Sequence, residues 1–170
     1  MIKLNNLINI KEKIYDFSEQ DLVNLHRTIY LTIISSVDFQ ECCHKLLKLN
    51  MKEGQEIELV NMIIECCIEE RTYLRFYGLL AERFCRIKDT YKQNFEFQFE
   101  HQYVKIHRLE TNKLRNLAKL FAHLFYTDAL DWAAFKIVKL TEDETTSSSR
   151  IFIKIICQEV IKIDILLILV

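Results

Sequence analysis

The sequence predicts an all-α fold, and three observations lead to that prediction. The chain has no Pro and only two Gly in 170 residues, so it lacks the residues that tight turns between strands favour. Apolar side chains recur every three or four positions, which is the period of an amphipathic helix. Half of the residues are hydrophobic and 28% are charged, a composition typical of globular proteins. We therefore expect about eight helices packed as antiparallel pairs.

The first half of the chain has the pattern of helices joined by short polar links. Ser18 with Asp21, and Asp38 with Glu41, each resemble a capping box at the start of a helix. Gly78 leaves a gap in an aromatic stripe and is expected to let a neighbouring helix approach closely. The helices expected here cover, approximately, residues 18–35, 38–47, 54–67 and 73–87.

The second half continues with the same period. The run FEFQFE at residues 95–100 alternates as a strand does, but no hairpin turn flanks it and the longer window fits a helix better. The expected helices cover, approximately, residues 89–106, 111–125, 128–138 and 147–170. The expected N-cap residues are Asp89, then Thr111 or Asn112, then Asp128, and finally one of Ser147, Ser148 and Ser149.

The last predicted helix is apolar on nearly every side. Lys154, Glu159, Lys162 and Asp164 interrupt it, so it is a poor candidate for a membrane span, which needs about 20 predominantly apolar residues. Its many Ile residues leave a strand as an alternative. We expect no membrane association.

The six Cys residues suggest a metal site at first sight. Neighbouring residues on a helix point about 100° apart, so the pairs Cys42–Cys43 and Cys66–Cys67 do not match the spacing of a zinc framework. Free Cys packs as a small hydrophobe, so we expect these pairs in the core, with Cys85 and Cys157 structural as well. The N-terminus lacks the h-region of a signal peptide, which indicates reduced thiols. No metal and no cofactor are predicted.

The composition and motifs also argue against several functions. The sequence contains no phosphate-binding glycine loop, dinucleotide fingerprint or serine nucleophile elbow, so we expect neither an enzyme nor a small-molecule substrate. The net charge is −1 and the pI is near 6.5, so no global field attracts nucleic acid or anionic lipid. His123 lies away from the apolar stripe of its helix, so we expect it on the surface or at a second helix interface rather than in a catalytic role.

Residues 105–124, KIHRLETNKLRNLAKLFAHL, contain a cluster of basic side chains. One interpretation is a basic ridge that contacts phosphate or an acidic protein, and the other is a polar link followed by a solvated helix face. The basic residues are Lys105, His107, Arg108, Lys113, Arg115 and Lys119. Similarly, the segment TEDETTSSSR at residues 141–150 is either a phosphorylatable loop, with Ser147 and Ser148 as acceptors, or an acidic linker with a cap.

Several runs resemble a known family. RTIYLTIISSVDFQECCHKLLKL, RTYLRFYGLLAERFC, HRLETNKLRNLAKLFAHLFYTDAL and TTSSSRIFIKI are similar to the second helical domain of the nucampholin family of pre-mRNA splicing factors. The resemblance covers about residues 16–159 and implies an MA-three domain, a HEAT-like stack of helix pairs. We expect residues 1–15 to be an extension and residues 16–170 to be one domain, incomplete at its C-terminus because the family pattern is lost after about Val160.

The resemblance also implies a function. The chain would be a nuclear scaffold component of the spliceosome that packs against U5 particle proteins and supports catalytic activation and delivery of the exon junction complex. The family binds an initiation-factor-4A-like DEAD-box helicase through a preceding domain that is not in this sequence. We hypothesise that the link HRLETNK caps the next helix and offers Arg108, Glu110, Lys113 and Arg115 as a docking edge. The alternatives are a helicase-binding regulator and an RNA-binding helical domain.

Overall fold

The computed structural model describes residues 19–139, 141 and 145–168, with side chains as far as Lys162. All regular secondary structure within these ranges is helical, which confirms the all-α prediction. The predicted cap at Ser18 lies outside them. The elements are α2 (Glu19–Ser35), α3 (Phe39–Leu47), α4 (Glu56–Glu69), α5 (Arg75–Ile87), α6 (Asp89–Lys105), the 3-10 helix η1 (Ile106–Arg108), α7 (Thr111–Tyr126), the 3-10 helix η2 (Trp132–Ile137) and α8 (Ser147–Ile168).

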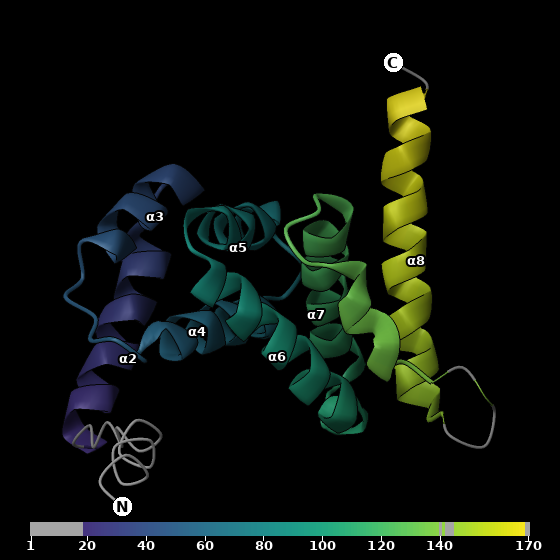
Figure 1. Cartoon of the computed structure of the whole chain (residues 1–170), viewed down its shortest axis with the longest axis horizontal. Coiled ribbons are helices and arrows are strands. Elements are labelled where there is room, and N and C mark those ends of the chain that lie inside the picture. The colour runs from purple at the N-terminus through teal and green to yellow at the C-terminus, as the bar shows by residue number, and fades with distance from the viewer. Residues whose placement is uncertain (1–18, 140, 142–144, 169–170) are drawn as a thin grey trace, which may run out of the picture.

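The helices form an elongated stack, with α2 and α3 at one end and α8 at the other (Figure 1). Helices that are two apart in the sequence pack on each other: α2 on α4, α3 on α5, α4 on α6 and α5 on α7. This is the arrangement of stacked helix pairs in HEAT-like domains. After α7 the short η2 segment takes the place of a second helix and leads the chain back, so α8 runs alongside α7 in the same direction (Figure 1).

The helix that begins at Phe39 has the cap that the sequence predicts. The carboxylate of Asp38 accepts a hydrogen bond of 2.8 Å from the backbone N–H of Glu41. The Glu41 carboxylate in turn accepts a 2.9 Å bond from the backbone N–H of Val37. One N–H group of the first helical turn and one just before the cap are thus satisfied within one short segment, and that is why sequence alone located this helix.

The predicted caps of α6 and α7 are wrong. Helix α6 has Lys88 as its N-cap residue and Asp89 as its first helical residue, and the side chain of Lys88 bonds to Glu56 at 2.7 Å instead. Helix α7 has Glu110 as its N-cap residue, in extended backbone and without a side-chain cap bond, so neither Thr111 nor Asn112 caps it. Each helix therefore begins one residue away from the residue that its local sequence favours.

Of the last two predicted caps, Asp128 is wrong, whereas Ser149, one of the three predicted serines, takes part in the cap of α8. Asp131 caps η2 by accepting a 2.8 Å bond from the N–H of Ala133, whereas Asp128 has a left-handed backbone with φ of 53°. At the start of α8 the hydroxyl of Thr146 accepts a 3.1 Å bond from the N–H of Ser149, whose hydroxyl accepts a 2.9 Å bond from the N–H of Thr146. This reciprocal pair is a capping box centred one residue before Ser147.

The two segments that could have been strands are helical. In α6 the side chains of Phe95 and Phe99, four residues apart, are buried, whereas Phe97 between them is 58% exposed. The apparent alternation therefore comes from one exposed aromatic residue on a helix. The Ile-rich C-terminal segment is helical as far as Ile168. Among the helices that the structure describes, none is long and apolar enough to span a membrane.

An aromatic cluster fixes the end of the stack where α7 and α8 meet. The ring of Phe99 from α6 lies with its centroid 5.1 Å from those of Phe121 and Phe125, both on α7. Phe135 from η2 and Phe152 from α8 pack on the same ring at 5.4 and 6.2 Å. Four elements, α6, α7, η2 and α8, therefore share one core, and α8 is held against the stack along its first turns.

The thiols divide between core and surface. Cys42, Cys43, Cys66, Cys67 and Cys85 are free and buried, which confirms that the adjacent pairs pack in the core. Cys157 on α8 is exposed, so the prediction of a structural role for it is wrong. Helix α8 is at the end of the stack and packs on α7 and η1 with one side, so outward positions such as Cys157 stay uncovered.

Candidate interaction surface

The start of α7 is fastened to the C-terminal end of α4. The side-chain amide of Asn116, which is buried, donates a 2.7 Å hydrogen bond to the backbone carbonyl of Glu70. The Glu70 carboxylate also accepts a 2.8 Å bond from the hydroxyl of Tyr77 on α5. Lys113 on α7 donates to the carboxylate of Glu69, the last residue of α4. These contacts hold α4, α5 and α7 together next to the link that precedes α7.

The structure places the four predicted docking residues on two different faces. Arg108 at the end of η1 and Glu110 in the link are exposed. Residues 113 and 115 are about 200° apart on a helix, so Lys113 faces α4 while Arg115 faces α8. Arg108, Glu110 and Arg115 are thus accessible to a partner. Lys113 is half-buried and already holds an ion pair within the domain.

A groove with basic walls runs between α7 and α8. We call it the α7–α8 groove, and it has a volume of about 480 Å³. Arg115 and Lys119 come from α7, and Lys154 and Lys162 come from α8. Ile151 and Ile155 add apolar surface to the groove, and Glu159 adds a carboxylate.

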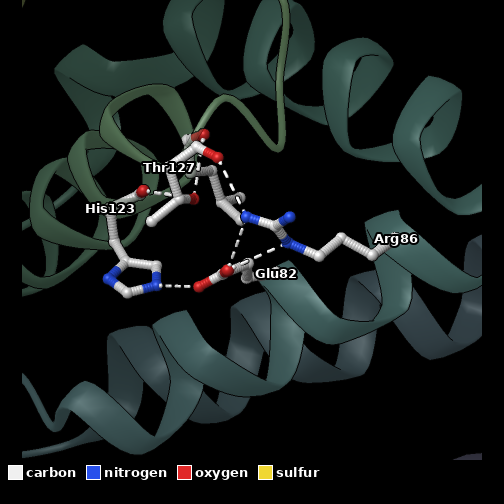
Figure 2. A network of polar contacts seen from close by, with 5 residues as sticks. Glu82, Arg86, His123 and Thr127 are labelled. Atoms are coloured by element: carbon white, nitrogen blue, oxygen red, sulfur yellow. Dashed lines mark hydrogen bonds and ion pairs between the residues drawn. The ribbon is translucent and has the colours of Figure 1, made fainter.

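A polar network joins α5 to α7 (Figure 2). The Nε2 atom of His123 lies 2.9 Å from the Glu82 carboxylate, and since a carboxylate only accepts, Nε2 is the protonated ring nitrogen. Arg86 pairs with the same carboxylate at 2.9 Å and donates a 3.2 Å bond to the backbone carbonyl of Thr127. The network joins residues that lie 41 positions apart in the sequence and holds α5 and α7 together.

His123 is buried, with only 9% of its surface exposed, and faces α5; of the two predicted placements, the second helix interface is confirmed and the surface is wrong. Its ring lies against Gly78 of α5, at the close helix approach that the sequence predicted for that glycine. Burial lowers the pKa of His123 below its ordinary value of 6.5, although the bond to Glu82 acts in the opposite direction. The ring is therefore neutral at physiological pH, which makes it a structural donor.

The buried thiols are chemically quiet. Burial raises the pKa of Cys42 and of Cys66 to about 11, so both are protonated near neutral pH. A metal-ligating or nucleophilic cysteine needs the thiolate form. Within the residues that the structure describes, no three His, Cys, Asp or Glu side chains converge as metal ligands.

Sequence reasoning missed the α8 side of the groove and the His123–Glu82 pair. The α8 residues Ile151, Lys154 and Ile155 have the i, i+3, i+4 spacing of one helix face, so a signal was present. It could not be used, because the spacing does not say which helix covers that face. The pair His123–Glu82 has no local signal at all.

A stack of helix pairs with charged grooves between its helices and neutral thiols in its core defines a helical interaction domain of the HEAT-like class. The comparison with known families agrees, since residues 25–131 match the MA3 domain model. The chain belongs to the MA3 domain family.

Curated relatives confirm the resemblance to the nucampholin family. Over 152 residues the chain is 55% identical to "Pre-mRNA-splicing factor cwf22" of Schizosaccharomyces pombe, which covers 89% of this chain and 17% of that protein. It is 58% identical over 149 residues to "Pre-mRNA-splicing factor CWC22 homolog" of Homo sapiens, covering 88% and 16%. The homologue of Drosophila melanogaster is 57% identical over 146 residues, covering 86% and 11%. The chain therefore spans a sixth or less of the length of these relatives.

Proposed function

We propose that this chain is a non-enzymatic protein-interaction domain that acts in pre-mRNA splicing in the nucleus. The observation that carries the proposal is an identity of 55–58% to proteins named as splicing factors in a yeast, a human and a fly, over 86–89% of the chain. Identity at this level over most of the chain supports a shared role. The partners that we propose are spliceosomal proteins, in particular those of the U5 particle.

The physical form of the domain supports a docking role. Five large aromatic residues and the α4–α7 fastening hold the stack rigid, so its exposed links keep fixed positions relative to each other. A rigid surface binds a large partner without a large loss of conformational entropy. A role in catalytic activation of the spliceosome and in delivery of the exon junction complex would follow from such a scaffold, within the longer protein that the relatives represent.

The docking edge that we propose consists of Arg108, Glu110 and Arg115, with Lys113 supporting it. The first three are exposed. Lys113 holds the base of α7 on α4 through Glu69, so it fixes the position of the edge. Charged side chains at the rim of an interface mainly set the rate and specificity of association.

Ser147 and Ser148 are proposed as phosphorylation sites. Ser147 is exposed and is the first residue of α8, while Ser148 is half-buried. A phosphate on Ser147 would lie at the N-terminal end of a helix, where the helix dipole favours negative charge.

Affinity purification from nuclear extract tests the docking proposal. The full chain and the variant R108E/R115E are immobilised, and recovered U5 proteins are quantified by mass spectrometry. The matched control is R27E/K48E, which reverses two exposed cations on α2 and beside α3. We expect the edge variant to lose most of the recovered U5 proteins and the control to keep them.

Equal recovery by both variants would refute the docking edge. Recovery of an initiation-factor-4A-type helicase without U5 proteins would favour a helicase-binding regulator instead. Loss of the recovered proteins after ribonuclease treatment would favour direct RNA binding.

A further inference from the structure

We propose that the α7–α8 groove binds an acidic protein segment that also carries apolar side chains. This surface is separate from the docking edge, except that Arg115 borders both. The proposal names a partner by its chemistry and holds whether or not the edge binds U5 proteins.

The charge of the groove is unbalanced. Arg115, Lys119 and Lys154 have neither an ion pair nor a hydrogen bond to another side chain among the described residues. Glu159 is the one carboxylate among the described lining side chains, and it is paired with Lys162 at 2.8 Å. Three cations thus lie along one groove of a chain whose net charge is −1, so their proximity is a local feature. Their mutual repulsion is relieved when an acidic segment lies between them.

The floor of the groove selects a particular kind of acidic partner. Ile151 is 42% exposed and Ile155 is half-buried, and they lie one turn apart along α8. Leucine-like side chains packed on them would remove apolar surface from water at about 25 cal/mol per Å². A partner that alternates acidic and apolar residues matches both the floor and the walls.

The dimensions suit a short segment. Lining residues on α8 extend from Ile151 to Lys162, a helical distance of about 16 Å at 1.5 Å per residue. About three turns of a helix, or about five residues of extended chain at 3.3 Å each, would cover it. Helices α7 and α8 run side by side in the same direction (Figure 1), and both supply residues that line the groove.

A protein segment fits the groove better than RNA does. Single-stranded RNA gains much of its binding energy by stacking bases on aromatic rings. No aromatic side chain lines the α7–α8 groove among the described residues, and its exposed floor is aliphatic. A phosphate backbone would neutralise the cations but would leave Ile151 and Ile155 in contact with water.

Fluorescence anisotropy with a labelled synthetic peptide tests the proposal on the purified chain. The probe is a peptide of Glu and Leu at helical spacing, and the control probes are the same peptide with Gln for Glu and an oligouridine. The test variants are K119E/K154E and the milder K119Q/K154Q, which both leave Arg115 in place. The control variant is again R27E/K48E.

We expect the Glu–Leu peptide to bind the unmodified chain and the control variant equally. K119E/K154E should weaken binding about tenfold or more and K119Q/K154Q by several-fold, with the affinity of the chain falling as salt is added. The Gln–Leu peptide should bind more weakly than the Glu–Leu peptide. Circular dichroism shows which variants are folded, and the Gln variant gives a result if the Glu variant is not.

Three results would overturn the proposal. One is unchanged peptide binding in a folded K119Q/K154Q variant. Another is tighter binding of oligouridine than of the peptide with the same dependence on Lys119 and Lys154, which would assign the groove to nucleic acid. The last is dimerisation of the chain in analytical ultracentrifugation that K119E/K154E abolishes, which would make a second copy the occupant. None of these depends on the docking edge, so the two proposals fail separately.

Discussion

Replacing Gly78 by Ala tests the closest helix contact of the stack. Gly78 is buried in α5, and a Cβ atom built on it lies 2.8 Å from Cγ of His123 on α7 and closer still to the hydroxyl of Tyr73. Both separations are shorter than a real methyl group tolerates. The Cγ atom of His123 is one bond from the Cβ atom and cannot move without shifting α7 or breaking the bond to Glu82.

Two opposing terms set the size of the effect. Alanine favours the helix over glycine by about 1 kcal/mol. Forcing an extra methyl group into a packed contact costs about 1–3 kcal/mol. Displacing His123 in the variant would also disturb its hydrogen bond to Glu82, which puts the cost at this site toward the upper end. We expect Gly78→Ala to lower the free energy of unfolding by about 1–2 kcal/mol. For a chain of this size that corresponds to a fall in Tm of about 2–8 °C.

Urea unfolding followed by far-UV circular dichroism measures this free energy. The control is Tyr73→Phe, because the Tyr73 hydroxyl is buried without a hydrogen-bond partner in the described structure and its removal also removes the closer of the two contacts. Tyr73→Phe alone should be neutral or stabilising. Gly78→Ala should cost less in the Tyr73→Phe background than in the unmodified chain. An alanine variant as stable as the parent, or an equal cost in both backgrounds, would refute the packing argument.

Three further predictions concern stability. Burial lowers the pKa of His123, so the unfolded chain takes up a proton that the folded chain does not. As the pH falls below 6.5, the free energy of unfolding should therefore drop more in the parent than in His123→Gln. Parallel curves of this free energy against pH, measured by urea unfolding, would contradict the prediction. Asp38→Ala should cost about 1 kcal/mol in the same assay because its cap bond is lost, whereas Asp89→Ala, which loses no cap bond, should cost only a few tenths. Asn116→Ala should cost about 1–2 kcal/mol because the carbonyl of Glu70 loses its donor, and a thermal melt with unchanged Tm would count against that fastening.

The limits of sequence reasoning are clearest at the helix starts. The cap at Asp38 was predictable because donor and acceptor lie three residues apart. The start of α6 was not, because Lys88 is held by Glu56 from another helix. Both sites have an acidic residue near a helix start, so local sequence cannot distinguish them. The difference lies in a contact across 32 positions.

The candidate surfaces show the same division. Arg115 was singled out because basic residues cluster near it in the sequence, and it is accessible in the structure. Its neighbours Lys154 and Ile155 come from α8 and were not associated with it. His123 was expected on the surface or at a second interface because it lies away from the main apolar stripe of α7, and the sequence could not choose between the two. That helix packs against α4, α5 and α8, so the side away from the stripe is also covered.

The sequence by itself determined that the chain is helical, where most helices run and that the two adjacent thiol pairs pack inside. It did so because hydrophobic period, turn composition and nearby caps act over a few residues. The tertiary structure decided how the charged side chains are grouped: Lys113 is paired with α4, His123 is buried against α5, and Arg115 and Lys119 face Lys154 across a groove. The physical reason is that the charge and exposure of a side chain depend on which helix packs beside it, and packing joins residues tens of positions apart.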